Sequence, residues 1–140
     1  MKTVVVVGAV VVGVIAVVAI VIVAGYFHRV PAPAGFEMPR HGLWGGGPAA
    51  LFTGTIVEED GCLVTDSDDD PSTVVWPARY YLRVNDGHLE VHGDGRVHVV
   101  GQPVALGGGQ YHRDELDGVA PEAAMTRCPE PFWLTTGWGE

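Results

Sequence analysis

Residues Val4 to Gly25, VVVVGAVVVGVIAVVAIVIVAG, form an apolar run without a charged or strongly polar side chain. About 22 residues make a helix of about 33 Å, enough to cross a hydrocarbon core of about 30 Å. Val and Ile are poor helix formers in water, but in lipid a lone segment can satisfy its backbone hydrogen bonds only as a helix. The run therefore predicts a transmembrane signal-anchor over residues 1–27, held in membrane lipid by residues 4–25.

Two other interpretations of this run are weaker. A cleavable signal peptide has an apolar core of about 7–15 residues, and this run is longer. The Ala-x-Ala match at 32–34 also lies well past the run, among prolines. A dinucleotide-binding turn needs three glycines, but here Val10 stands between Gly8 and Gly13. Cleavage stays open as an alternative, and the dinucleotide turn is rejected.

Charge on the two sides of the run indicates its orientation. Lys2 precedes the run and Arg29 follows it, which gives only a slight lean to a cytoplasmic N-terminus. Past Arg40 the chain holds five arginines, no lysine and sixteen of its seventeen acids. Because an acidic domain suits the outer side of a membrane, we expect a single-pass protein of the cell membrane with an extracytoplasmic domain.

Composition bounds the rest of the chain. With 140 residues and a net charge of −9, the chain has room for one domain beyond the anchor, and the acidic balance argues against nucleic acid as a partner. Residues 28–50 are rich in Pro, Gly and Ala, which predicts a linker that lifts the domain off the membrane. The domain is expected at 51–140. Outside the cytoplasm its two cysteines, Cys62 and Cys128, predict a disulfide, with a two-ligand metal site or free thiols as rivals.

Short β-type runs separated by turn signals fill the domain. Strands are expected at 52–58, 62–65, 73–76, 80–84, 88–92, 96–100, 104–106 and 132–135. Turns are expected at 59–61, 85–87 and 93–95, the glycines at 107–109 are expected to end a strand, and 110–124 has room for one helical turn. The pattern predicts an all-β fold, a small antiparallel OB-like barrel or sandwich preceded by the transmembrane helix.

The apolar positions of these runs define the expected core. Its members are Ile56, Leu63, Val75, Leu82, Leu89, Val91, Val97, Val99, Val104, Leu106 and Trp133.

The run from Asp94 to Gly109, DGRVHVVGQPVALGGG, carries a loose resemblance to a wider group of proteins. Together with Gly61-Cys62-Leu63, Val75-Trp76-Pro77 and Cys128-Pro129, it resembles uncharacterised small secreted or membrane-anchored proteins of high-GC Gram-positive bacteria. The similarity covers roughly residues 53–134 and concerns turn and core positions. It implies a fold and a location and carries no catalytic residue.

Two patterns could bind a metal ion. Asp66, Asp68 and Asp70 open like a calcium loop, but Pro71 and Pro77 stand where such a loop needs Gly and Glu. His88, Glu90 and His92 alternate along one expected strand, so they share a face and could ligate zinc or copper, with His98 near on the next strand. The blander interpretation is a solvated loop and the wet face of a strand, which we favour. No cofactor is expected.

The sequence offers few candidate catalytic residues, because its only serines lie in the acidic loop and no G-x-S-x-G or H-E-x-x-H motif occurs. We therefore expect a non-enzymatic module that binds an envelope protein or component through an exposed patch formed by Trp76, Tyr80 or Tyr81. A divalent-metal-binding module is the alternative, and a small hydrolase is less expected. The sequence names no partner.

Overall fold

The computed structural model describes residues 30–42, 49–68 and 70–139, so the expected anchor at 1–27 lies outside the described residues. Of the described part, 51% is strand and 11% helix, which confirms the expected all-β class. No helix within it is long and apolar enough to cross a membrane.

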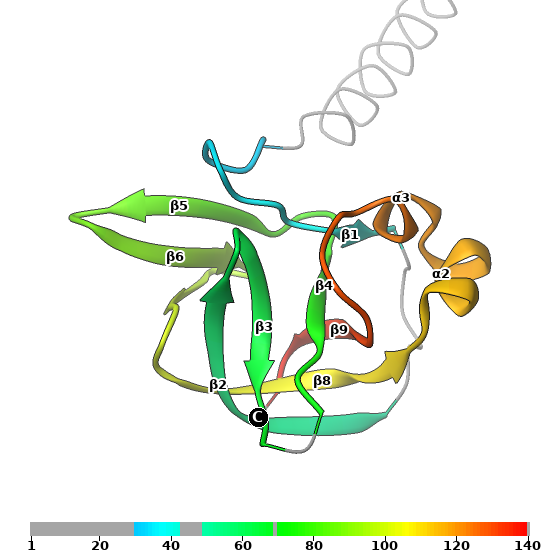
Figure 1. Ribbon diagram of the computed structural model, residues 1–140. Helices are drawn as coiled ribbons and strands as arrows, with labels where there is room; N and C mark the ends of the chain where they lie inside the picture. Colours follow the sequence, from blue (N-terminus) through cyan, green and yellow to red (C-terminus); the bar gives the residue numbers. More distant parts are fainter. Residues whose placement is uncertain (1–29, 43–48, 69, 140) are drawn as a thin grey trace, which may run out of the picture.

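Five strands close into a barrel (Figure 1). They are β2 (Ala50–Glu59), β3 (Cys62–Asp66), β4 (Thr73–Pro77), β8 (Pro103–Tyr111) and β9 (Phe132–Trp138). The order around the barrel is β2-β3-β4-β9-β8 and back to β2, with β4 and β9 parallel and the other neighbours antiparallel. Closure depends on the length of β2, whose second half pairs with β3 and whose first half pairs with β8. The expected barrel is therefore present, and the sandwich is not.

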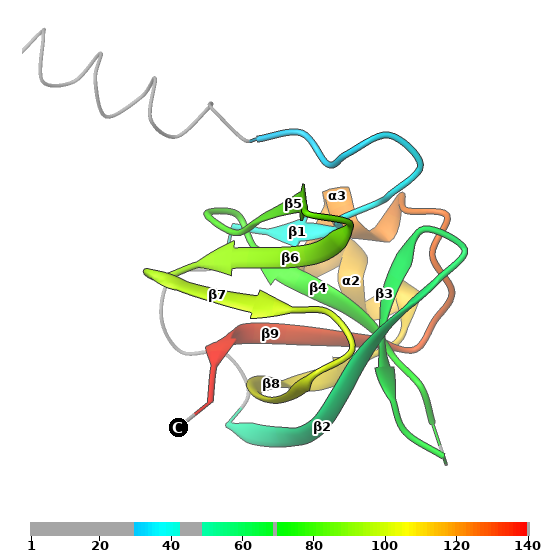
Figure 2. The same ribbon diagram turned by 90° about the vertical axis from the view of Figure 1, so that its left-hand side faces the viewer.

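A second, three-stranded antiparallel sheet is inserted between β4 and β8. It contains β5 (Tyr81–Asn85), β6 (His88–Gly93) and β7 (Arg96–Val99), in that order. Both of its hairpin turns have two residues with positive φ, Asp86-Gly87 and Asp94-Gly95, as a type I′ turn requires. Figure 2 shows this sheet from its outer side, with β5 nearest the N-terminal segment and β7 nearest β8 and β9.

The expected linker at 28–50 is partly wrong, because its described residues 30–41 pack on the domain. β1 (Arg40–His41) pairs in parallel with the end of β4, beyond the point where β3 leaves that strand. Phe36 and Met38 pack against the barrel core. Gly61 allows this approach, since a Cβ there would lie 2.1 Å from the Gly35 carbonyl oxygen. Composition alone could not reveal a docked segment in a Pro-rich stretch.

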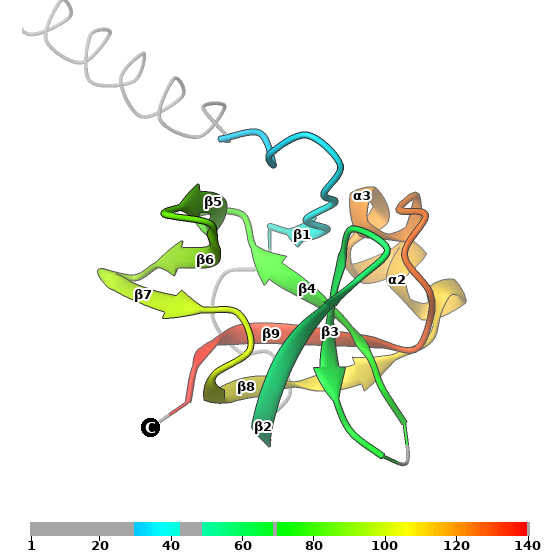
Figure 3. The same cartoon turned by 60° about the vertical axis from the view of Figure 1, so that its left-hand side comes forward.

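Two short helices, α2 (Arg113–Val119) and α3 (Pro121–Ala124), connect β8 to β9 in the chain. They cover one side of the barrel (Figure 3). The α2 N-terminus is capped by Glu115, whose carboxylate accepts from the His112 N–H at 2.6 Å. The helices bury a second apolar cluster, formed by Val75, Leu116, Ala120, Ala123, Phe132 and Leu134. Because of this cover, β4 and β9 are buried on both faces, which a strict in-and-out alternation does not predict.

The main core lies inside the barrel and under the inserted sheet. Six expected core residues are fully buried: Ile56, Leu63, Val75, Leu82, Val91 and Leu106. Four are only half-buried: Leu89, Val99, Val104 and Trp133. Val97 is 56% exposed and corrects the expectation, because it pairs with His92 on the outer face of the sheet while His98 turns inward.

The glycines at 107–109 do not end a strand, as β8 continues to Tyr111. At Gly108 the backbone has a φ of 155°, and a Cβ would lie 2.2 Å from the Leu134 carbonyl oxygen. The register also shifts between Gly107 and Gly108. The glycines therefore permit a bulge and close contact with β9 rather than a turn.

Candidate binding surface

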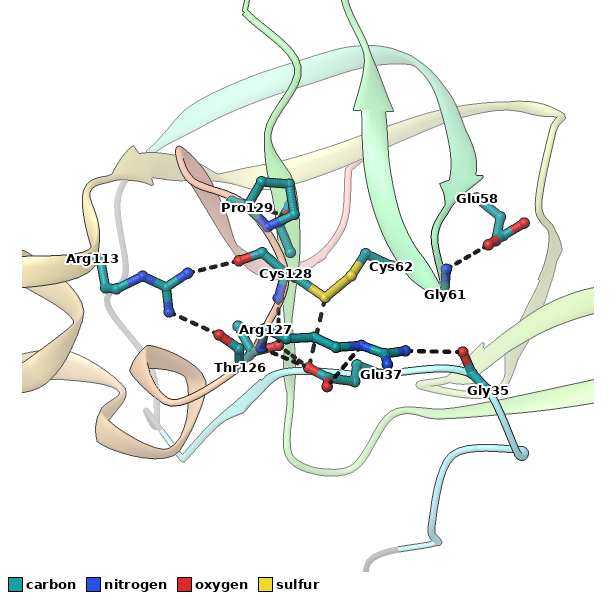
Figure 4. The surroundings of a disulfide bond; sticks show 11 residues. Gly35, Glu37, Glu58, Gly61, Cys62, Arg113, Thr126, Arg127, Cys128 and Pro129 are labelled. Atoms are coloured by element: carbon teal, nitrogen blue, oxygen red, sulfur yellow. Dashed lines mark hydrogen bonds and ion pairs between the residues drawn. A yellow bond between two sulfur atoms is a disulfide. The ribbon is translucent and has the colours of Figure 1, made fainter.

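The expected disulfide joins Cys62, at the start of β3, to Cys128, in the loop before β9, with 5.8 Å between their Cα atoms. Both residues are buried, and no described cysteine is free. The Glu37 carboxylate sits beside the bond and accepts from the Thr126 hydroxyl and the Arg127 N–H, while Arg127 pairs with it at 3.1 Å (Figure 4). The disulfide thus fixes the loop whose contacts with Glu37 hold the N-terminal segment on the barrel.

The loop around Cys128 is fixed from its other side by Arg113. Its guanidinium donates to the carbonyl oxygens of Ala124, Thr126 and Cys128 at 2.6–2.9 Å. The Cys128 sulfur lies 3.8 Å from the Glu37 carboxylate, which is a contact only, since a disulfide sulfur carries no hydrogen. The polar groups around the disulfide hydrogen-bond to one another, which indicates a structural role for this region rather than a reactive one.

The expected aromatic patch is wrong for two of its three members. Trp76 and Tyr80 are 0% and 1% exposed, because Trp76 points into the barrel and Tyr80 stacks on it with ring centroids 5.7 Å apart. Tyr81 alone lies on the outer face of the inserted sheet, half-buried and stacked on His92 at 4.9 Å. Consecutive tyrosines in an extended chain point to opposite faces, so only one of the pair could be exposed.

Tyr80 instead anchors the inserted sheet to the barrel. Its hydroxyl donates to Asp94 Oδ2 at 2.7 Å, in the turn between β6 and β7, and Arg79 pairs with the same carboxylate. The Arg79 guanidinium and the Tyr80 hydroxyl both hold the pKa of Asp94 below its ordinary value, the arginine bond being the larger cause. Trp138 completes the joint, since its Nε1–H donates to the Gly93 carbonyl at 2.8 Å.

The outer face of the inserted sheet carries an ordered polar row. Nε2 of His92 donates to Glu90 at 2.8 Å, and the Asn85 amide donates to the same carboxylate at 3.3 Å. These bonds, His92 first, lower the pKa of Glu90. Arg83 stands opposite Glu90 in the register and Tyr81 opposite His92.

The expected metal ligands are only partly brought together. Glu90 and His92 meet, but exposed His88 does not join them, while His98 faces inward opposite Val91. Asp66, Asp68 and Asp70 are exposed, with Asp70 accepting from the Gln110 amide at 2.7 Å. Within the described ranges no three His, Cys, Asp or Glu residues gather as a metal would require. The metal-binding alternative stays a prediction, and of its expected ligands only Glu90 and His92 are adjacent.

A groove runs between β7 and the barrel, which the sequence did not reveal. Its volume is about 170 Å³, and its lining residues are Arg96, Val97, His98, Val104, Ala105, Trp138 and Gly139. Leu51 extends it, because a Cβ on Gly139 would lie 2.6 Å from the Leu51 side chain. The His98 ring packs against Trp138 at 5.8 Å, and its buried Nε2 has no hydrogen-bond partner among the described residues. Burial lowers the pKa of His98.

The groove has an apolar rim and an open strand edge. Val97 lines the groove and is 56% exposed, and Leu51, beside Gly139, is 58% exposed. β7 is the outermost strand of its sheet beside the groove. An edge strand presents backbone donors and acceptors that another extended chain can use. β9 continues past its expected end at 135, and this added length brings Trp138 to the groove.

No protein-family model, curated protein or solved structure matches this chain.

Proposed function

We propose that this protein is a membrane-anchored, non-enzymatic binding module of the cell envelope, with a cytoplasmic N-terminus and an extracytoplasmic OB-type barrel. The anchor is the apolar run at 4–25. The strand order of the barrel, with its parallel β4–β9 pair, supports the OB-type assignment. The function we assign to the domain is capture of an extended segment of a partner protein along β7.

The open edge of β7 beside the apolar groove carries this proposal. Gly93 and Arg96 flank a two-residue turn, so they form the first hydrogen-bonded pair of the hairpin. Hydrogen-bonded and non-hydrogen-bonded pairs alternate along an antiparallel hairpin, so the next pair, His92 and Val97, is not hydrogen-bonded. The backbone N–H and C=O of Val97 therefore point away from β6 and toward the groove. An extended peptide could add there as a further strand, with an apolar side chain set between Val97, Trp138 and Leu51.

OB-type barrels bind oligonucleotides and oligosaccharides on one particular face, and in this chain that face is covered. A peptide bound elsewhere is therefore favoured over these ligands. The binding face of an OB-type barrel lies over its second and third strands, which correspond to β3 and β4. In this chain β1, the Cys128 loop and the two helices cover it. The net charge of −9 also disfavours a polyanion.

Removal of one backbone donor tests the proposal. Val97→Pro deletes an N–H that faces the groove, whereas Val97→Thr keeps it and the β-branched shape. With a photo-reactive residue in place of Arg96 in the full-length protein in its own membranes, we expect a discrete cross-linked protein that Val97→Pro abolishes and Val97→Thr preserves.

A photo-reactive residue in place of Asp68 is the positional control, since this residue is exposed in the loop between β3 and β4, which lies on the other side of the barrel from β7 (Figures 2 and 3). A cross-link that survives Val97→Pro, or that forms equally from position 68, contradicts strand addition. A melting curve of each variant shows that the barrel itself is intact.

A further inference from the structure

The N-terminal segment from Val30 to His41 is fixed to one pole of the barrel. The Arg40 guanidinium donates to the Val30 carbonyl at 2.6 Å, which ties the first described residue to β1. The Glu37 N–H donates to Gly61 at 2.8 Å, and the Trp76 N–H donates to Pro39 at 2.9 Å. The chain therefore enters the domain at a defined point instead of through a spacer.

This entry point lies close to the end of the apolar run. Five peptide units separate Gly25 from Val30, and they reach at most about 18 Å. The lipid head groups take up about 5–7 Å of that reach. What remains, about 11–13 Å, is far less than the diameter of a domain of about 110 residues, whose radius of gyration alone is about 13 Å. The domain cannot turn its opposite pole to the membrane.

We propose that the domain rests directly on the outer membrane surface, with the pole around Val30 and the end of α3 facing lipid. The proposal rests on the anchor assigned under the proposed function. Two large exposed hydrophobic residues mark this pole, Val30 at 47% and Met125 at 81% exposure. Met125 is held there because its neighbours Thr126 and Arg127 bind Glu37 of the docked segment.

The charge of the opposite pole agrees with this orientation. The loop between β3 and β4, with exposed Asp66 at its start and exposed Asp68 and Asp70 within it, lies at the end of the barrel farthest from the cyan N-terminal segment in all three ribbon views (Figures 1–3). Such a loop has no favourable electrostatic contact with lipid head groups, and any anionic lipid in the outer leaflet repels it. The outer face of the inserted sheet then looks sideways, with β5 toward the membrane and β7 away from it (Figure 2). A strand added along β7 would then run roughly parallel to the membrane, on the side of the sheet away from it (Figure 2).

Fluorescence quenching by lipid tests this orientation in the full chain. We would label Met125→Cys or, as the matched control, Asp68→Cys with the native disulfide kept oxidised. The protein would be reconstituted in phosphatidylcholine and phosphatidylglycerol vesicles with or without a nitroxide on the lipid head group. The expected result is a loss of fluorescence at position 125 and none at position 68.

A flexible Gly/Ser spacer of about 20 residues inserted between positions 29 and 30 should remove the quenching at position 125, because a coil of this length reaches about 25 Å. Equal quenching at both positions, or none at position 125 in a protein that resists carbonate extraction, overturns the orientation. Release of the protein by carbonate overturns the anchor itself, and with it the proposed function.

Discussion

At the scale of single residues, the Tyr80 hydroxyl joins the two sheets of the domain. It is buried and donates to Asp94, which also binds Arg79. We expect Tyr80→Phe to lower the free energy of unfolding by about 1.5–3 kcal/mol, the range for a hydrogen bond to a charged group. Urea denaturation of the oxidised protein measures it. Tyr81→Phe is the matched control, and an equal loss in both variants would contradict a specific role for Tyr80.

His98 makes stability depend on pH. Burial lowers its pKa in the folded state, so below about pH 6.5 the unfolded chain binds a proton that the folded chain does not. Stability is fully present above that pH and falls as the pH drops toward the lowered pKa. Buried His41 acts in the same direction.

We therefore expect the free energy of unfolding to decrease between about pH 7 and pH 5, and His98→Gln to flatten that slope. Exposed His88→Gln is the control. Chemical denaturation across this pH range decides the point. An unchanged slope in His98→Gln would show that its imidazole does not resist protonation.

At the residue scale, the alternation of apolar and polar positions predicts burial only where one face of a sheet is exposed to solvent. Alternation placed Leu82 and Val91 correctly, because both lie on a sheet with one wet face. It missed Phe132 and Leu134, since helices cover the outer side of β9 and bury them. It was wrong for Val97, because a groove between two sheets depends on tertiary packing that no local period encodes.

At the scale of elements, the disulfide and the docked segment stabilise each other. The bond closes a loop with a sequence separation of 66, and restriction of the unfolded chain accounts for about 4 kcal/mol in the entropic model. We expect reduction and the double variant Cys62→Ser/Cys128→Ser to lower the urea midpoint to a similar degree. A midpoint unaffected by either would show that the Glu37 and Arg113 contacts alone hold the loop.

Most elements were accessible from the sequence because their turns are local. The turns at Asp60-Gly61, Asp86-Gly87 and Asp94-Gly95 all have positive φ, and each was expected from its Asp-Gly pair. β1 and the second half of β8 were missed for the opposite reason. Pairing of Arg40 with Trp76 and close contact of Gly108 with Leu134 join distant parts of the chain, and Pro- or Gly-rich composition hides both.

At the scale of the whole molecule, the folding unit begins before the expected boundary at residue 51. Phe36 and Met38 contribute to the main core, and β1 covers the edge of β4 at Trp76. Burial of each of these two side chains stabilises by about 1.5–3 kcal/mol at full burial, and both are only half-buried here. Their joint contribution is therefore roughly 1.5–3 kcal/mol.

Because the N-terminal segment packs on the core, we expect a fragment of residues 30–140 to melt cooperatively at a clearly higher temperature than a fragment of residues 49–140. The difference should persist in the oxidised state, because the disulfide is present in both fragments. Phe36→Ala/Met38→Ala in the longer fragment should shift its midpoint most of the way toward that of the shorter one. If the two fragments melt together, the segment is a passive linker after all, the entry point at Val30 is not fixed, and the orientation on the membrane loses its physical basis.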